Sequence, residues 1–480
     1  MANSKNSILS GLFWSYGERI TAQLVSLVVT IVLARLIAPE EYGVIALVTV
    51  FISIANTFVS DGFGAALVQK PGADNLDFST VLYFGVGLSV VLYLVLFATA
   101  PLIAGYYVMP VLTLVVRLMA LRLPVAAINS VQHAYISKRM EFKKFFFSTL
   151  FGTIVSAVVG IGMAFLGFGV WALVGQYLTN SLIDTIVLLF TTGWRPVLQF
   201  SFERLKPLVA FGWKILAVAL MTTLYTNIRN LIIGKRYSSA ELAYNNKGQQ
   251  FPSLISTNIN ATISSVIFPA ISAQQGDMGR VLAMTRKSIK VGTYLMAPLL
   301  LGMAALGEPI VRILLTEKWL PCVPYLQIMC MVYLLQPIQT ASIQAMKALG
   351  KSTTYLRLEV LKKVGGLLIL FLSIVCCDGV IYIVFSSLLA EIFSAVVNFP
   401  ANKKLLGYRY SEQILDVAKP LAAAVVMCGA VLLLGSVLGD GIINLFIQIV
   451  VGAVVYLLLS VLFKIDSLGY LLTVVKSHHH

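Results

Sequence analysis

The sequence predicts an all-α membrane protein with about fourteen transmembrane helices. Of its 480 residues, 59% are hydrophobic and only 11% are charged, and the mean hydropathy is +0.90. Soluble proteins carry about 25% charged residues. Apolar runs of about 20 residues recur along the whole chain, and each is long enough to cross a ~30 Å hydrocarbon core as a helix. The loops between them leave no room for a large soluble domain.

The basic residues of these loops predict the orientation of the chain. On one side of the membrane only Lys235, Arg236, Arg312 and Lys318 lie near the span ends, and the other side holds most of the remaining Lys and Arg. Cytoplasmic loops carry this excess, so both termini are predicted to be cytoplasmic. The spans lie near 10–36, 43–68, 79–103, 111–135, 145–166, 169–192, 208–233, 241–272, 288–306, 324–348, 356–376, 379–400, 415–438 and 441–463.

An internal repeat divides the spans into two sets of six. With a shift of 200 residues, "ARLIAPEEYG" (34–43) falls on "GKRYSSAELA" (234–243), and the stripe of small polar residues in span two falls on a similar stripe in span eight. With a shift of 210, "GFGVWALV" (167–174) falls on "CDGVIYIV" (377–384). The four matches, which include a Pro and Gln pair in spans four and ten, occur in the same order in both halves.

The repeat predicts the domain organisation. Residues 1–200 form an N-terminal lobe of helices 1–6, residues 201–410 form a C-terminal lobe of helices 7–12, and residues 411–477 add helices 13 and 14. Each lobe has an even number of helices, so both insert the same way up, about an axis along the membrane normal. Residues 478–480 are three histidines, typical of a purification-tag remnant, and are excluded.

Polar stripes on spans one, two, seven and eight predict the site. Arg19 lies on such a stripe in the first span, and charges in a bilayer are costly unless they face protein or water. A hydrated, mainly basic cavity between the lobes explains the stripes and suits an anionic substrate. The alternative is that Ser, Thr and Asn only join helices. The candidate cavity residues are Arg19, Gln23, Ser26, Asn56, Lys214, Thr222, Tyr225, Arg229, Lys247, Gln249 and Asn260.

Several other ionisable residues lie inside predicted spans. Arg117 and Arg122 in span four are further candidates for the basic surface, or they snorkel or pair within the lobe. His133 is interpreted as a polar helix end. Four carboxylates are candidates for ion coupling, with a structural, hydrogen-bonded role as the alternative: Glu18, Asp61, Asp184 and Glu391.

The sequence contains no enzyme or cofactor motif. No Gly-x-x-x-x-Gly-Lys-Ser/Thr loop is present, which argues against ATP hydrolysis by this chain. The Cys, His and carboxylate residues have no metal-ligand spacing, so neither a metal nor another cofactor is expected. The net charge of +15 is explained by cytoplasmic loops rather than by nucleic-acid binding.

Two stretches resemble a known family. "LFWSYGERI…LARLIAPEEYGVIALV" and "GFGVWALVGQYL" are similar to bacterial polysaccharide flippases of the multidrug/oligosaccharidyl-lipid/polysaccharide exporter superfamily, and the resemblance extends over nearly the whole chain. It implies two six-helix lobes around a central cavity that alternates its access. The implied substrate is an undecaprenyl-diphosphate-linked oligosaccharide, moved across the cytoplasmic (inner) membrane for assembly of capsule, lipopolysaccharide or exopolysaccharide. A polymerase and other assembly proteins are the implied partners.

Two alternatives to a flippase remain open at this point. A cation- or proton-coupled drug antiporter of the same superfamily should have a cavity dominated by carboxylates, whereas the stripes here are mainly basic. A membrane enzyme that acts on lipid-linked sugars, such as a polymerase or ligase, should have a large external loop, and the sequence has none. We therefore expect a transporter and not an enzyme.

Overall fold

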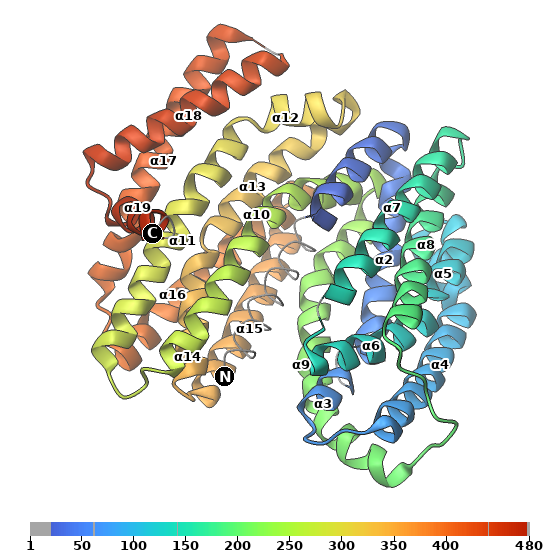
Figure 1. The fold of residues 1–480 in the computed structure, drawn as a ribbon. Helices are drawn as coiled ribbons and strands as arrows, with labels where there is room; N and C mark the ends of the chain where they lie inside the picture. The colour runs from blue at the N-terminus through green and yellow to red at the C-terminus, as the bar shows by residue number, and fades with distance from the viewer. Residues whose placement is uncertain (1–20, 61–62, 142, 440, 478–480) are drawn as a thin grey trace. The chain divides into compact units, whose positions relative to one another are not determined.

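The computed structural model describes residues 21–60, 63–141, 143–439 and 441–477, and all regular secondary structure in these ranges is helical. The chain divides into two compact units, Met1–Ala243 and Tyr244–His480, with the boundary inside α10 (Ser239–Ser272). Figure 1 traces the helices of each unit in chain order. The all-α fold class is confirmed. The lobes predicted from the repeat stay a prediction.

The first unit is built around α2, which packs against α5, α6, α8 and α9, while α7 and α8 form an antiparallel pair at its side. α9, the predicted first helix of the second lobe, packs on α2, α3 and α4. The helices of this unit are Thr21–Leu36, α2 (Pro39–Ser60), α3 (Phe63–Gln69), α4 (Asn75–Tyr107), α5 (Val111–Ala120), α6 (Arg122–Arg139), α7 (Lys143–Phe165), α8 (Val170–Thr191) and α9 (Phe202–Arg236).

The second unit is centred on α11, which contacts α13, α14 and α17. α15 and α16 pair at its side as α7 and α8 do in the first unit. Its helices after α10 are α11 (Met278–Ala305), α12 (Gly307–Leu314), the 3₁₀ helix η1 (Glu317–Cys322), α13 (Val323–Leu334), α14 (Gln336–Ala348), α15 (Ser352–Cys376), α16 (Val380–Leu406), α17 (Tyr410–Leu438), α18 (Ile442–Leu462) and α19 (Asp466–Ser477).

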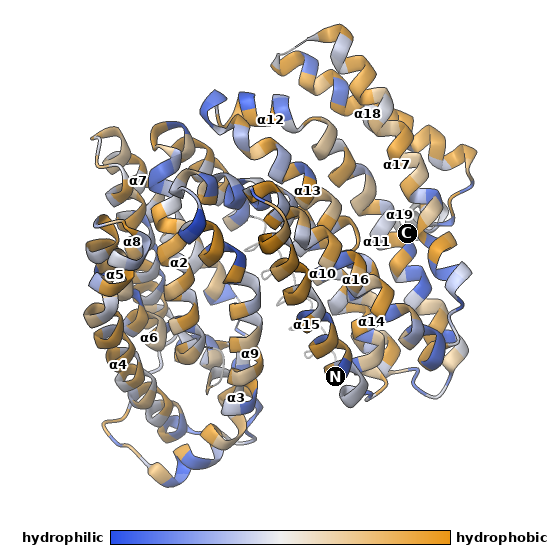
Figure 2. Cartoon of the chain, turned by 180° about the vertical axis from the view of Figure 1, so that it is seen from behind, coloured by the Kyte–Doolittle hydropathy of each residue, from blue (hydrophilic) through white to orange (hydrophobic). Residues whose placement is uncertain are grey.

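Twelve segments of the described chain are long and apolar enough to cross a membrane. Helix Thr21–Leu36 is shorter than these, and α15 carries four charged residues in its first half. The predicted number of fourteen spans is therefore not confirmed. Large apolar side chains are exposed along α4, such as Val91 and Leu94, and Figure 2 shows α4 as mainly hydrophobic. Such a surface is stable in lipid, and the chain is a multi-pass membrane protein.

Two of the predicted spans are interrupted at matching places. Span four is broken at Leu121, between α5 and α6, and span ten is broken at Leu335, between α13 and α14. Pro124 and Pro337 lie in the first turn after each break. Proline has no backbone N–H and clashes with the preceding turn, so it favours a new helix start at both positions. The break places Arg122 at the first residue of α6.

A charged network joins α11 to α17 in the second unit. The Arg286 guanidinium donates to both carboxylate oxygens of Asp416, at 2.7 and 3.0 Å, and to Glu412 at 2.8 Å. The Tyr408 hydroxyl also donates to Asp416, at 2.7 Å. Lys290 lies 3.4 Å from Asp416 and 3.0 Å from the carboxylate of Asp466 at the start of α19. This network fixes the packing of α11 against α17.

Candidate functional site

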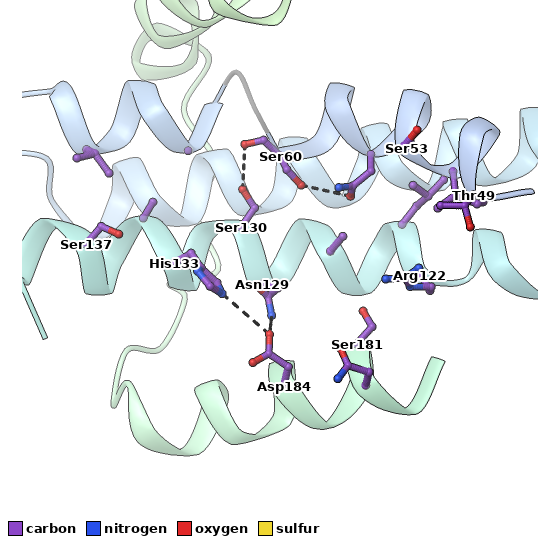
Figure 3. A pocket seen from close by; sticks show the side chains of 18 residues that line it. Thr49, Ser53, Ser60, Arg122, Asn129, Ser130, His133, Ser137, Ser181 and Asp184 are labelled. Carbon is purple, nitrogen blue, oxygen red and sulfur yellow. Dashed lines mark hydrogen bonds and ion pairs between the residues drawn. The ribbon is translucent and has the colours of Figure 1, made fainter. Parts of the chain in front are cut away.

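The first unit contains a polar cavity of about 710 Å³ between α2, α3, α6 and α8. Most of its polar groups are hydroxyls and amides, as Figure 3 shows. The lining residues are Thr49, Ile52, Ser53, Asn56, Ser60, Gly64, Val68, Arg122, Leu123, Ala126, Asn129, Ser130, His133, Ala134, Ser137, Asn180, Ser181 and Asp184. We refer to this set as the polar cavity.

The polar face of the cavity comes mainly from α6. Arg122, Asn129, His133 and Ser137 recur at spacings of seven, four and four residues, which places them along one side of a helix. The break at Leu121 places Arg122 in the first turn of α6, at the start of this face. The opposite face of α6 carries buried Ala127 and Val131, which pack within the unit.

Arg122 supplies a positive charge that no carboxylate in the described part of the chain pairs with. Its guanidinium carbon lies 5.2 Å from the ring centroid of Tyr177 on α8. The Nε atom is buried and has no hydrogen-bond partner, and Arg122 forms no ion pair within the described ranges. A cation over an aromatic face is held in place by the ring quadrupole. The guanidinium is therefore oriented by Tyr177 while its N–H donors stay available to an anionic group in the cavity.

Asp184 lies in the same cavity beside Asn129 and His133. The Asn129 amide donates to the Asp184 carboxylate at 2.6 Å and to the Thr185 hydroxyl at 3.2 Å. The His133 Nε2 atom lies 4.0 Å from the same carboxylate oxygen, and its ring stacks on Phe145 with centroids 4.4 Å apart. The other carboxylate oxygen of Asp184 is buried without a hydrogen-bond partner.

The α2 side of the cavity is lined by Ser53, Asn56 and Ser60. The Ser60 hydroxyl donates to the Asn56 side chain at 3.3 Å, and the Ser130 hydroxyl of α6 donates to the Ser60 carbonyl at 3.4 Å. The Asn56 amide therefore lies at the surface of the cavity with donor capacity available to a ligand.

The predicted site residues of the first unit lie in several places. Asn56 and Asp184 line the polar cavity. Arg19, Glu18 and Asp61 lie outside the described residues, so their predicted roles stay predictions. Gln23 is half-buried and Ser26 is exposed on helix Thr21–Leu36; on α9, Lys214 and Thr222 are exposed, while Tyr225 and Arg229 are half-buried, with the Arg229 guanidinium 5.8 Å from the Tyr225 ring centroid.

The predicted residues of α10 contact α13 and α14 through a ladder of hydrogen bonds. Gln249 donates to the Tyr333 hydroxyl at 2.9 Å, and Asn260 donates to Gln336 at 3.0 Å while it accepts from Thr340 at 3.0 Å. The ladder is completed by Ser256 to Gln336 at 2.5 Å and by Gln344 to Ser264 at 3.0 Å. The stripe that lines a cavity in α2 thus joins helices in α10.

The two remaining candidates of the second unit are largely enclosed by protein. Lys247 is buried, donates to Gln250 at 3.3 Å and lies 5.6 Å from the ring centroid of Trp319. Glu391 is half-buried on α16. Within the described ranges, no group of three or more His, Cys, Asp or Glu residues has the geometry of a metal site.

Sequence reasoning selected Arg122 and Asp184 but not the other polar residues that α6 and α8 contribute to the cavity. Asn129, Ser130, Asn180 and Ser181 were not candidates, and His133 was interpreted as a helix end. The available signal was the polar face of α6 after Pro124. That face is short, and the sequence alone does not indicate whether it meets protein or an open cavity.

By its fold and its cavity, this chain is a polytopic helical membrane protein with a polar cavity of about 710 Å³ inside its first unit. The model of the family described as "Polysaccharide biosynthesis protein" matches residues 32–324, which is more than half of the chain. The chain belongs to this family.

Named relatives match across most of their length. The chain is 24% identical over 430 residues to the lipopolysaccharide biosynthesis protein WzxC of Escherichia coli (strain K12), which covers 87% of this chain and 85% of the relative. It is 23% identical over 472 residues to the teichuronic acid biosynthesis protein TuaB of Bacillus subtilis (strain 168), with 96% of each chain covered. The succinoglycan biosynthesis transport protein ExoT of Rhizobium meliloti (strain 1021) is 22% identical over 463 residues, covering 93% and 91%.

Solved structures share the fold. The lipid II flippase MurJ in an inward closed conformation matches with a TM-score of 0.76 at 14% identity, covering 95% of this chain and 99% of that chain. An inward-facing multidrug resistance transporter of the MATE family, in the MOP superfamily, matches with a TM-score of 0.62 at 14% identity, covering 80% and 94%. These likenesses confirm the predicted all-helical transporter fold.

Proposed function

We propose that this chain is a flippase that carries an undecaprenyl-diphosphate-linked oligosaccharide repeat unit across the cytoplasmic membrane by alternating access. The observation that carries the proposal is the polar cavity, in which Arg122 offers a guanidinium without a carboxylate partner among the described residues. A guanidinium pairs well with phosphate and carboxylate groups. Family membership and the named relatives, which are polysaccharide biosynthesis and transport proteins, support the same function.

The cavity suits a sugar headgroup in its size and polarity. Hydroxyl and amide groups of Ser53, Asn56, Asn129 and Ser181 surround a volume of about 710 Å³, and a small ligand site has about 300–1,000 Å³. Sugar hydroxyls both donate and accept hydrogen bonds, which matches the mixed capacities of Ser and Asn side chains. The polyprenyl tail would stay in lipid. The chain itself would catalyse no bond-making step.

A drug antiporter is not favoured. The likeness to MATE transporters concerns the fold alone, and the relatives with curated names belong to polysaccharide assembly. Asp184 remains a candidate for ion coupling, together with Glu18, Asp61 and Glu391. A polysaccharide polymerase remains a candidate partner. The proposal also places the protein in the cytoplasmic membrane with both termini on the cytoplasmic side. The excess of basic residues in the loops of that side supports this orientation.

Deletion of the gene in its native bacterium tests the function. We expect complete oligosaccharide repeat units to accumulate on polyprenyl diphosphate, measured by mass spectrometry of extracted lipids, and the wild-type gene to reverse this. Complementation with R122Q removes the charge in the cavity and should fail. R117Q is the matched control, because Arg117 stacks on Phe97 at 4.1 Å outside the cavity, and it should restore export.

Two results would contradict the proposal. If no lipid-linked sugar accumulates while sensitivity to drugs rises, the chain exports drugs. If R122Q and R117Q restore export equally at equal protein levels, the polar cavity is not the headgroup site even where the flippase function holds.

The orientation has its own test. Fusions of a fluorescent protein that folds only in the cytoplasm, and of alkaline phosphatase that is active only outside, report the side of each terminus. We expect fluorescence and no phosphatase activity for fusions at both termini. Phosphatase activity at either terminus would reverse the proposed orientation.

A further inference from the structure

A second cavity, of about 600 Å³, lies at the end of the first unit where α4 begins and α6 ends. Its walls are residues 73–75 and Phe78 at the start of α4, Tyr135, Lys138 and Arg139 at the end of α6, and the segment 193–195 after α8. It shares only the helix α6 with the polar cavity and has no lining residue in common with it. We refer to it as the end cavity.

Aromatic rings form the floor of the end cavity. The Phe78 ring lies 5.4 Å from Tyr135 and 6.2 Å from Trp194, measured between centroids, and Tyr135 lies 6.0 Å from Trp194. Phe78 and Trp194 are buried. Tyr and Trp gather at the membrane–water boundary, where one side of the ring is apolar and the other is wet. The end cavity therefore has the composition of an interfacial site.

The segment that carries Trp194 is held rigidly. Gly193 has φ +66°, a left-handed conformation that glycine adopts readily, and it turns the chain from α8 toward α4. The Trp194 indole N–H donates to Asn75 at 2.5 Å, and the Asn75 amide donates to the Arg195 carbonyl at 3.2 Å. The site is thus preformed, which lowers the entropic cost of binding.

Three cations line the end cavity and none of them forms an ion pair with a carboxylate in the described part of the chain. Lys138 donates to the backbone carbonyls of Leu67 and Lys70. The Arg139 guanidinium lies 4.3 Å from the Tyr135 ring centroid, and Arg195 donates to the Leu189 carbonyl at 2.7 Å. Backbone carbonyls and rings hold these groups in place without neutralising their charge.

One carboxylate lies at the edge of the end cavity, and its charge is balanced by a neighbour. The Arg204 guanidinium donates to Asp74 at 2.5 Å and holds the pKa of the Asp74 carboxyl below its ordinary value. Asp74 also accepts from the backbone N–H of Asp77, at 3.0 Å, as the N-cap of α4. The net charge facing the cavity is therefore positive.

We propose that the end cavity binds the headgroup of an anionic phospholipid. The phosphate would lie between Arg139, Lys138 and Arg195, and the glycerol of a phosphatidylglycerol headgroup would hydrogen-bond to Asp74. Basic pockets between helix ends bind anionic lipid headgroups in this way. With the orientation proposed above, the site faces the cytoplasmic leaflet.

Native mass spectrometry of the full-length protein tests the site. The detergent-solubilised protein is titrated with phosphatidylglycerol and with phosphatidylethanolamine of identical acyl chains. We expect wild type to retain phosphatidylglycerol preferentially. R139Q, at an exposed position, should weaken retention about fivefold, and R139Q/R195Q should weaken it about twentyfold, since each basic group near a membrane surface contributes about 1 kcal/mol.

A matched pair of variants controls for overall charge. Lys403 and Lys404 are exposed on α16 in the second unit, so K404Q and K403Q/K404Q remove the same charges elsewhere and should bind as wild type does. If the variants at Lys403 and Lys404 lose as much phosphatidylglycerol binding as the variants at Arg139 and Arg195, net charge attracts the lipid and the proposal fails. Equal retention of both lipids by wild type would also overturn it.

The source of the phosphate is distinguished by competition with soluble glycerol phosphate. Partial displacement of the lipid by millimolar glycerol phosphate is expected, because the headgroup is shared. Binding of glycerol phosphate without any retention of phosphatidylglycerol would assign the end cavity to a soluble phosphate compound and would contradict the lipid proposal. None of these measurements depends on the flippase function.

Discussion

The carboxylate of Glu41 accepts a hydrogen bond from the backbone N–H of Val170, at 3.1 Å, across 129 residues of sequence. Its second oxygen accepts from the backbone N–H of Ala38 at 3.3 Å. Glu41 belongs to the stretch "APEEYG" and Val170 to "GFGVWALV", the two motifs that carry the family resemblance. One side chain thus satisfies unpaired N–H groups at the starts of both α2 and α8.

Replacement of Glu41 should therefore destabilise the first unit. E41A leaves two helix starts without their acceptor, and we expect a loss of about 1–2 kcal/mol in the free energy of unfolding. The loss is measured as a change in the melting temperature of detergent-solubilised protein, monitored by size-exclusion chromatography. E40A is the matched control, because Glu40, the residue before Glu41, is exposed. Equal melting temperatures for E41A and E40A would contradict the assigned role.

Gly169, the residue before Val170, lies against the same Glu41 carboxylate. It has φ +56°, and a Cβ atom there would lie 2.0 Å from the Glu41 carboxylate. G169A should therefore lower the melting temperature at least as much as E41A does. In the double variant E41A/G169A the clash is absent while the backbone strain persists, so the two losses should not add. Full additivity would mean that the Cβ atom and Glu41 do not compete for space.

Asn129 should be essential for transport because it positions Asp184 in the polar cavity. N129L removes the donor at 2.6 Å from the Asp184 carboxylate and places an apolar group among the hydroxyls. We expect transport to fall at least tenfold at an unchanged protein level, measured as accumulated lipid-linked oligosaccharide. N444L is the control, since Asn444, in the first turn of α18, donates to the carbonyl of Leu438 at the end of α17, in the second unit. Normal transport by N129L would remove Asn129 from the site.

The basic residues of the predicted stripes have a separate test. R19A, K214A and R229A should each impair export without abolishing membrane insertion, because a charged headgroup would lose a partner while the apolar spans are unchanged. Arg19 lies outside the described residues, so this prediction rests on the sequence pattern. Normal export by all three variants at normal protein levels would exclude these stripes from the transport path.

The ladder between α10 and α14 should stabilise the second unit rather than bind substrate. Q336L removes the acceptor shared by Ser256 and Asn260, and leaving these donors unpaired costs about 1–3 kcal/mol. We expect a lower melting temperature with near-normal transport by the protein that remains folded. S264A, which removes the single bond from Gln344, should have a smaller effect. Loss of transport at an unchanged melting temperature would make the ladder part of the substrate path.

A double-mutant cycle can measure the link between Arg286 and Asp416. R286M leaves the Asp416 carboxylate, whose side chain is only 6% exposed, without its main partner, and breaking such a pair costs about 3–5 kcal/mol. D416L should cost a similar amount. The double variant should be more stable than the sum of the two losses implies, with a coupling free energy above 1 kcal/mol. Strict additivity in thermal unfolding would mean that the two charges do not interact.

Composition and periodicity predicted the class of fold well, since a bilayer imposes long apolar helices and short loops. The repeat also aligned α2 with α10, whereas the breaks at Leu121 and Leu335 were not predicted. The different use of the two stripes could not be predicted. Asn56 and Asn260 are the same residue type on matching helices, and the helix that faces each of them decides whether it lines a cavity or joins two helices. In the second unit α14 offers Gln336, Thr340 and Gln344 as partners. In the first unit α6 leaves space beside Ser130 and His133.

The Arg286 network has a consequence for how the chain enters the membrane during synthesis. Arg286 lies on α11, but its partner Asp416 lies on α17, 130 residues later in the chain. A nascent chain that has emerged only as far as α16 holds the Arg286 guanidinium without either carboxylate of α17, so α11 lacks the ion pairs that fix it against that helix. Newly made α11 would therefore stay loosely packed until α17 arrives. Truncations before Asp416 should accordingly be degraded, whereas those after α17 should accumulate.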